Sequence, residues 1–111
     1  MCIGVSVDFA YIRLDRNGTV IDIGDTAGNR PRVTGAFGSY NGGTNTIYDT
    51  TQVPVMFIDS PASTSSVTYK FQLRSGSTAA AVYINRSGSD RDTVDYEWRT
   101  PSNIVLMEIA V

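Results

Sequence analysis

The chain has 111 residues, a mass of 12.0 kDa and a formal net charge of −2 at pH 7, which fits one small domain covering residues 1–111. It contains no histidine and a single cysteine, Cys2, so the usual general base is missing and neither an internal disulfide nor a thiolate zinc site can form. The mildly acidic balance argues against a nucleic-acid-binding surface, and no apolar run approaches the roughly 18 residues of a membrane span.

Short apolar stretches alternate with turn residues along the whole chain, a texture typical of an antiparallel all-β sandwich or barrel. No window shows a sustained helical period. Near the N-terminus the alternating apolar residues occupy odd positions at Val5, Val7 and Phe9, and then even positions at Ile12 and Leu14. We expect a β-bulge between the two sets to restore the register.

Asn17 and Gly18 give the strongest local hairpin signal, because both residues accept a positive φ. The return strand is expected at residues 20–24. Shorter elements follow along the chain: a polar loop at 25–31, a strand at 32–37, a turn at 40–45 and a stretch at 52–59 that is apolar on both parities and carries Pro54. Proline cannot donate to a ladder, so Pro54 belongs at a strand start, a bulge or an edge.

The cleanest element is residues 67–74, in which apolar and polar side chains alternate strictly. This alternation predicts a strand with one buried and one solvated face. A further strand is expected at 79–85. The polar, charged stretch from Arg86 to Arg99 is expected to be a long loop.

The chain ends in a stretch, residues 104–111, in which seven of eight residues are apolar. Both faces of a strand here would need cover. One solution places one face on its own sheet and the other on further copies around a three-fold axis, where each large side chain contributes roughly 1.5–3 kcal/mol. A central strand buried within one sandwich is an equally compatible alternative. The predicted interface residues are Ile104, Val105, Leu106, Met107 and Ile109.

Glu108 is the one charged residue of this stretch, and a carboxylate in an apolar contact needs a partner. Arg86 is the expected partner. Eight of the nine basic residues are arginines, the residue preferred in bidentate and interface contacts. We expect at least one of Arg30, Arg32 and Arg86 to form an ion pair.

The sequence offers little equipment for catalysis. The carboxylates of Asp90, Asp92 and Asp95 cluster in one loop, but their spacing does not match a calcium-binding EF-hand. A solvated loop with ion pairs is the favoured interpretation, and a bound cation stays the alternative. Without histidine, the common serine triad cannot be built. We therefore expect no enzyme activity, no cofactor and no metal.

Tyr96, Trp98 and Arg99 form an aromatic and cationic group in the same loop. Exposed aromatic rings stack on sugars or anchor protein contacts, so these residues are candidates for a receptor-binding loop. Packing of Trp98 beneath its own loop is the favoured alternative.

Several short motifs occur in a defined order, and together they span most of the chain: Gly24–Arg30 with Arg32-Val33, Asp59-Ser60-Pro61, Thr68-Tyr69-Lys70, Val82–Ser87 and Leu106–Ala110. This series resembles the C-terminal β-domain of aquatic, cyanophage-type tailed-phage virion proteins of the structural and tail-fibre kind. The resemblance implies a jelly-roll-like antiparallel β-sandwich, assembly as a homotrimer, display on a virus particle and no catalytic residues. Proteins of this type carry further strands ahead of the position of Val5, so either a partner supplies these strands or the fold closes with fewer.

Together these features predict a bacteriophage structural protein, a homotrimeric capsid decoration or cement protein, because the chain is short and shows no shaft or anchor segment. The alternative is a tail-fibre or spike tip that binds a host-surface glycan. The expected partners are further copies of the chain and either the major capsid protein or a fibre shaft, without nucleic acid or membrane. The first residues lack a secretory signal, so the expected location is the virion, after synthesis in the host cytoplasm.

Overall fold

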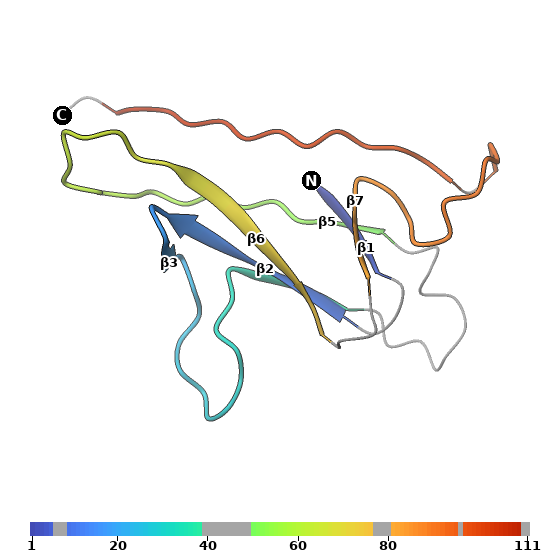
Figure 1. Ribbon diagram of the computed structural model, residues 1–111, viewed down its shortest axis with the longest axis horizontal. Helices are drawn as coiled ribbons and strands as arrows, with labels where there is room; N and C mark the ends of the chain where they lie inside the picture. Colours follow the sequence, from blue (N-terminus) through green and yellow to red (C-terminus); the bar gives the residue numbers. More distant parts are fainter. Residues whose placement is uncertain (6–8, 39–49, 77–80, 96, 110–111) are drawn as a thin grey trace.

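The computed structural model describes residues 1–5, 9–38, 50–76, 81–95 and 97–109 (Figure 1). Within these ranges the chain is all-β and contains no helix. The strands are β1 (Cys2–Val5), β2 (Phe9–Arg16), β3 (Thr19–Ile21), β4 (Gly35–Gly38), β5 (Thr50–Gln52), β6 (Tyr69–Ser75) and β7 (Val82–Ile84). They form two antiparallel sheets, an arrangement consistent with a β-sandwich, in a flattened molecule of 49 × 37 × 19 Å. The turn expected at 40–45 lies outside the described residues.

The first sheet has the order β5-β1-β7, so β1 is its central strand. All four residues of β1 are buried. Ile3 and Val5 belong to the hydrophobic core. Gly4 has the opposite parity, and a Cβ atom added there would lie 2.5 Å from the carbonyl oxygen of Arg86. The chain after β7 therefore covers the outer face of this sheet.

The second sheet is built around β2, which pairs with β6 over residues 10–16. The other edge of β2 is shared, because β3 pairs with residues 14–16 and β4 with residues 9–12. Thr34 fills the junction between these two short strands. Its hydroxyl accepts the backbone N–H of Leu14 at 2.8 Å and donates to the carbonyl of Ile21 at 3.4 Å.

Between β3 and β4, residues 24–32 form an exposed loop with a narrow neck. The backbone N–H of Gly24 donates to the carbonyl of Val33 at 3.3 Å. The guanidinium of Arg32 donates to the carbonyl of Gly24 at 2.6 Å, and that of Arg13 donates to the carbonyl of Arg32 at 2.9 Å. The polar loop predicted here is confirmed, and arginine-to-backbone hydrogen bonds close it.

Both sheets contribute to the hydrophobic core, which consists of Ile3, Val5, Ala10, Ile12 and Phe37. This corrects the bulge expected near Ala10. Val5 lies in β1 of one sheet, whereas Ile12 lies in β2 of the other. The change of apolar parity thus marks the passage of the chain from one sheet to the next.

The hairpin predicted at Asn17 and Gly18 is confirmed, with φ angles of 51° and 89°. It joins β2 to β3 in the register Arg16↔Thr19. Asp15 is buried beneath it, and its carboxylate accepts the backbone N–H of Gly18 at 2.9 Å. The other carboxylate oxygen accepts the side-chain amide of Gln72 at 3.0 Å, so one acidic side chain joins the turn to β6.

The alternation predicted for residues 67–74 is also confirmed. The inward set, Tyr69, Phe71 and Leu73, is half-buried, whereas Lys70, Gln72 and Arg74 are exposed. Phe71 and Leu73 pack against the core. On the outer face, the guanidinium of Arg74 lies 5.8 Å from the ring centre of its cross-strand neighbour Tyr11.

The C-terminal segment differs from the prediction. Residues 101–109 are extended but form no ladder with any described strand, and every one of them is exposed. In Figure 1 the segment runs along one border of the molecule as an orange-to-red trace. The expectation that one of its faces lies on its own sheet is wrong for the single chain, because none of the described strands covers residues 101–109.

Candidate functional site

Two regions gather the residues that the sequence analysis singled out: the loop after β7 and the C-terminal segment. Asn85 closes the loop at its base, in a left-handed conformation with φ of 62°. Its backbone N–H donates to the carbonyl of Cys2 at 2.9 Å, and its own carbonyl accepts the N–H of Thr100 at 3.1 Å. Its side-chain oxygen accepts the hydroxyl of Ser102 at 2.9 Å. Both ends of the loop are therefore fixed to β1.

Glu97 lies inside the loop, with a side chain that is only 4% exposed. The hydroxyls of Ser87 and Ser89 donate to its two carboxylate oxygens, and the guanidinium of Arg91 lies 3.9 Å away. The hydrogen bonds from Ser87 and Ser89 outweigh the effect of burial, so the pKa of Glu97 lies below its ordinary value. Glu97 thus organises the loop as an ionised acceptor. The sequence analysis missed its serine partners, although Ser87-Gly88-Ser89 places two hydroxyls two residues apart.

Arg86 and Asp90 form an ion pair at 2.6 Å. Arg99 contacts the same carboxylate, and the guanidinium of Arg86 also lies 4.4 Å from the ring centre of Tyr83. The expectation that at least one of three arginines forms an ion pair is confirmed. The pairing of Arg86 with Glu108 is wrong within one chain, because Asp90, four residues along, already holds this guanidinium while Glu108 is exposed.

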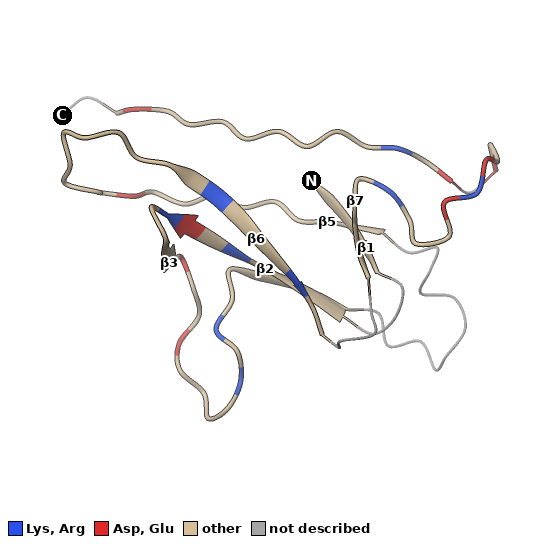
Figure 2. Cartoon of the chain, in the orientation of Figure 1, with Lys and Arg blue, Asp and Glu red and all other residues tan. Residues whose placement is uncertain are grey.

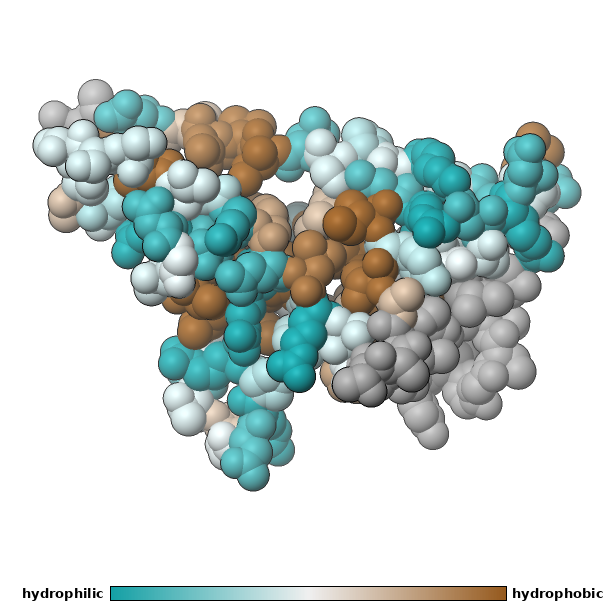
Figure 3. Space-filling model, viewed as in Figure 1, coloured by the Kyte–Doolittle hydropathy of each residue, from teal (hydrophilic) through white to brown (hydrophobic). Residues whose placement is uncertain are grey.

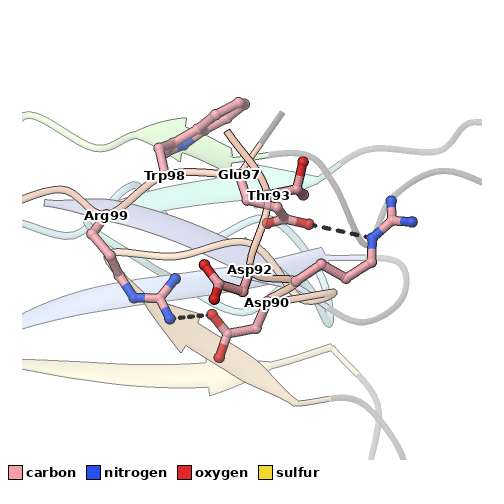
Figure 4. A pocket seen from close by; sticks show the side chains of 7 residues that line it. Asp90, Asp92, Thr93, Glu97, Trp98 and Arg99 are labelled. Carbon is pink, nitrogen blue, oxygen red and sulfur yellow. Dashed lines mark ion pairs between the residues drawn. The ribbon is translucent and has the colours of Figure 1, made fainter. Parts of the chain in front are cut away.

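Figure 2 shows Lys, Arg, Asp and Glu residues gathered along this loop. Their side chains surround an open hollow of about 370 Å³ (Figure 4). The residues that line it are Asp90, Arg91, Asp92, Thr93, Glu97, Trp98 and Arg99.

Trp98 is 45% exposed, and its indole N–H donates to the hydroxyl of Thr50 at 3.1 Å. The structure brings Trp98 and Arg99 to one hollow, whereas Tyr96 lies outside the described residues. The hydrogen bond to Thr50 therefore fixes the indole ring of Trp98 against β5, while the ring stays partly open to solvent.

The three aspartates weighed as cation ligands do not converge. Asp90 faces the two arginines. The described part of the chain contains no group of three or more acidic, histidine or cysteine side chains that could hold a metal. It also contains no helix that could span a membrane.

A second carboxylate, Asp59, forms a compact polar cluster at the far end of the segment that follows β5. It accepts hydrogen bonds from Arg16, the hydroxyl of Tyr69 at 2.8 Å and the backbone N–H of Ser60 at 2.9 Å. Burial alone would raise the pKa of Asp59, but these hydrogen bonds and the charge of Arg16 hold it below its ordinary value. The bond to Asp59 raises the pKa of Tyr69. The cluster is fully paired and serves as a structural joint.

The C-terminal segment carries the largest run of exposed apolar side chains in the described chain, which we call the apolar strip. Its members and their exposed fractions are Ile104 (57%), Val105 (78%), Leu106 (66%), Met107 (83%) and Ile109 (73%). Figure 3 shows apolar surface along this border of the molecule. Met56 and Ile58, on the segment after β5, are 96% and 84% exposed. Contiguous exposed apolar surface of this kind marks interaction sites.

The chain matches no family model, no curated protein and no solved structure.

Proposed function

We propose that this protein is a structural component of a bacteriophage virion, a jelly-roll-like β-sandwich that assembles as a homotrimer and decorates or cements the capsid. One observation carries the assembly part of the proposal: the five side chains of the apolar strip are 57–83% exposed in the single chain. Each large apolar side chain that becomes covered contributes roughly 1.5–3 kcal/mol. Covering side chains of the apolar strip therefore favours association over the free monomer.

The charged groups of the described chain support a structural role over a catalytic one. Asp15, Asp59 and Glu97 are the least exposed carboxylates in the ion pairs and hydrogen bonds described above, and each has its oxygens occupied by donors. No buried side-chain nitrogen or oxygen of the described residues is left without a partner. Such satisfied networks stabilise a fold, whereas a general acid or base needs an atom turned toward a substrate.

The virion location rests on the resemblance of the motifs between Gly24 and Ala110 to phage virion proteins. A decoration protein would use the apolar strip between its own copies and a polar face toward the major capsid protein.

Two measurements test this proposal in order. Light scattering and native mass spectrometry of the purified chain at micromolar concentration are expected to give three copies, and a monomer would contradict the homotrimer. A cryo-electron microscopy reconstruction of the particle is then expected to place many copies at three-fold or quasi-three-fold points of the head. A few copies at the tail would reject decoration.

The second candidate is a tail-fibre or spike tip that binds a host-surface glycan. It is favoured by the partly open ring of Trp98 beside Arg99 in the loop hollow, since aromatic faces stack on sugar rings. A glycan array tests it, with Trp98→Ala as the variant expected to lose the signal. Phe57→Ala, a change at an exposed aromatic residue outside the hollow, is the matched control. An array without binders would argue against the tip.

A further inference from the structure

Among the described residues, the edge of β6 from Tyr69 to Leu73 pairs with no second strand, and its polarity is defined. Within the described residues β6 pairs only with β2, which lies beside it in Figure 1. The pairing is antiparallel and unbroken, and it includes Leu14↔Phe71 and Arg13↔Gln72. Just beyond the ends of this ladder, the N–H of Asn17 donates to the carbonyl of Thr68 at 3.0 Å and the N–H of Gly76 donates to that of Phe9 at 2.8 Å.

Antiparallel strands alternate between residues that bond the partner and residues that point away from it. Thr68 and Gly76 bond β2, so Lys70, Gln72 and Arg74 do the same. The backbone N–H and C=O groups of Tyr69, Phe71 and Leu73 therefore face the open edge. Unpaired groups of this kind are a template for another strand.

The C-terminal segment has the complementary properties. Residues 101–109 are extended, exposed and outside any ladder of the described chain. The origin of the segment is held at the first sheet, because Thr100 and Ser102 both bond Asn85. In the single chain it leaves its own β6 unoccupied. The segment thus offers free backbone groups and an apolar face, which are the two requirements of strand addition.

From this complementarity we propose that the segment of one copy adds as an antiparallel strand to the free edge of β6 in a second copy. The inference rests on the homotrimer of the proposed function and assigns its mode of assembly. Two cations lie on the polar face of β6, Lys70 and Arg74. Pairing Glu108 with Arg74 would set Met107 opposite Ser75, so the register that keeps Met107 opposite an apolar side chain pairs Glu108 with Lys70. Met107 then lies opposite Phe71, and Leu106 opposite Gln72.

This register pairs the charges and sets three of the five residues of the apolar strip beside apolar side chains, whereas Ile104 and Leu106 lie on the polar face. Val105, Met107 and Ile109 continue the apolar face formed by Leu73, Phe71 and Tyr69. Glu108 joins the polar face of β6, where the amine of Lys70 is only partly engaged, since its side chain is 58% exposed and 3.7 Å from Asp15. Each copy gives one strand and accepts one, so the contact is head-to-tail, and the homotrimer of the proposed function requires it to close as a ring of three.

The register makes a parity prediction that hydrophobic contact alone does not. Met107 faces the outward-pointing groups of Phe71, so its N–H is bonded, whereas the N–H of Leu106 points to solvent. Met107→Pro is expected to raise the dissociation constant of the contact between copies about tenfold or more above that of Met107→Ala. The proline variant loses the backbone hydrogen bond as well as the side chain. Leu106→Pro is expected to match Leu106→Ala within about threefold. Equal effects at both sites, or a reversed pattern, would overturn the proposed pairing.

Cross-linking identifies the two partners. Leu106 and Gln72 form a non-bonded pair in this register, with Cα atoms about 4.5 Å apart, within reach of a disulfide. In a Cys2→Ala background, Gln72→Cys with Leu106→Cys is expected to give disulfide-linked trimers on a non-reducing gel. The matched control, Gln72→Cys with Val105→Cys, places the second thiol on the other face and is expected to stay uncrosslinked.

The outcomes separate this inference from the proposed function. Trimers that do not cross-link at these positions would overturn strand addition and leave the homotrimer intact. A cross-link within a single chain would overturn it as well, because the segment would then occupy its own β6. An unmodified chain that is monomeric would contradict the proposed function itself.

Discussion

The guanidinium of Arg16 lies 2.6 and 2.8 Å from the two carboxylate oxygens of Asp59, 43 residues along the chain. Arg16 is the last residue of β2, and Asp59 ends the apolar segment that follows β5. Tyr69, the first residue of β6, donates to the same carboxylate. Three parts of the chain therefore meet at one acidic side chain, close to the start of the free edge of β6.

From the contacts of Asp59 with Arg16 and Tyr69 we predict a specific loss of stability in acid. The pKa of Asp59 is depressed in the folded chain, so its contribution is present above the ordinary aspartate pKa and is lost as the pH falls through the depressed value. We expect Asp59→Asn to lower the melting temperature at pH 7. The difference from the unmodified chain should shrink steadily below pH about 4. Thermal denaturation across pH measures it, and Asp25→Asn, in the exposed loop, is the control that should show no such trend.

Removing the buried carboxylate under the first hairpin should destabilise the whole second sheet. Asp15→Ala leaves the N–H of Gly18 and the side-chain amide of Gln72 without their acceptor. The expected cost is about 1–3 kcal/mol in the free energy of unfolding. Urea denaturation of this variant and of Asp25→Ala, an acidic residue in the exposed loop beyond the same hairpin, provides the comparison. Equal stability of the two would show that the hairpin does not depend on Asp15.

A methyl group at Gly4 is expected to disrupt the contact between β1 and the loop base. The added Cβ would lie 2.5 Å from the carbonyl oxygen of Arg86, a backbone atom that cannot rotate away. Gly4→Ala should therefore cost about 1–3 kcal/mol. At Gly24 nothing lies within 4 Å of the same atom, so Gly24→Ala should be close to neutral in the same denaturation experiment.

The serine pair inside the loop after β7 is expected to set the acidity of Glu97. Ser87→Ala with Ser89→Ala removes the two hydroxyl donors that lower the pKa of Glu97. That pKa should then rise toward or above the ordinary glutamate value. Carbon-13 NMR titration can follow it, because the chain has only two glutamates, Glu97 and Glu108, whose carboxyl signals can be assigned separately. An unchanged titration of Glu97 would contradict the assigned contacts.

A charge within the apolar strip should separate assembly from folding. Val105→Asp or Met107→Asp places an unpaired carboxylate in a covered apolar contact, and we expect monomers at micromolar concentration. Both residues are exposed in the single chain, so the free energy of unfolding of the monomer should change by no more than about 0.5 kcal/mol. Val94→Asp, at a residue that is 98% exposed outside the strip, should leave the oligomer unchanged.

Local patterns predicted the elements whose cause is local. Asn17-Gly18 determined its own turn, and the alternation through Phe71 determined the face of β6, because turn chemistry and period 2 act within a few residues. The passage from β1 to β2 was misread as a bulge. A parity change alone does not distinguish a bulge from a change of sheet, which depends on the distant partners of Val5 and Ile12.

The partners of the charged side chains were the least predictable feature. Asp90 pairs with Arg86 because it lies four residues away in a loop that folds back on itself. The predicted pairing of Arg86 with Glu108 rested only on the need of a carboxylate in an apolar stretch for a partner. Asp59 joins Arg16 and Tyr69 only through the tertiary fold. The apolar strip is apparent from composition, and its role as an interface stays a prediction. The exposure of its side chains in the single chain depends on the tertiary fold, because none of the described strands packs over them.

The narrow neck of residues 24–32 has a practical consequence. Its closure depends on the Gly24 and Val33 backbone pair and on two arginine side chains that reach backbone carbonyls. None of these bonds involves the outermost residues of the loop, so a foreign peptide spliced next to Gly28 would leave the anchoring untouched. The molecule would then carry that peptide as a tethered epitope on a fold that does not need to rearrange to accept it.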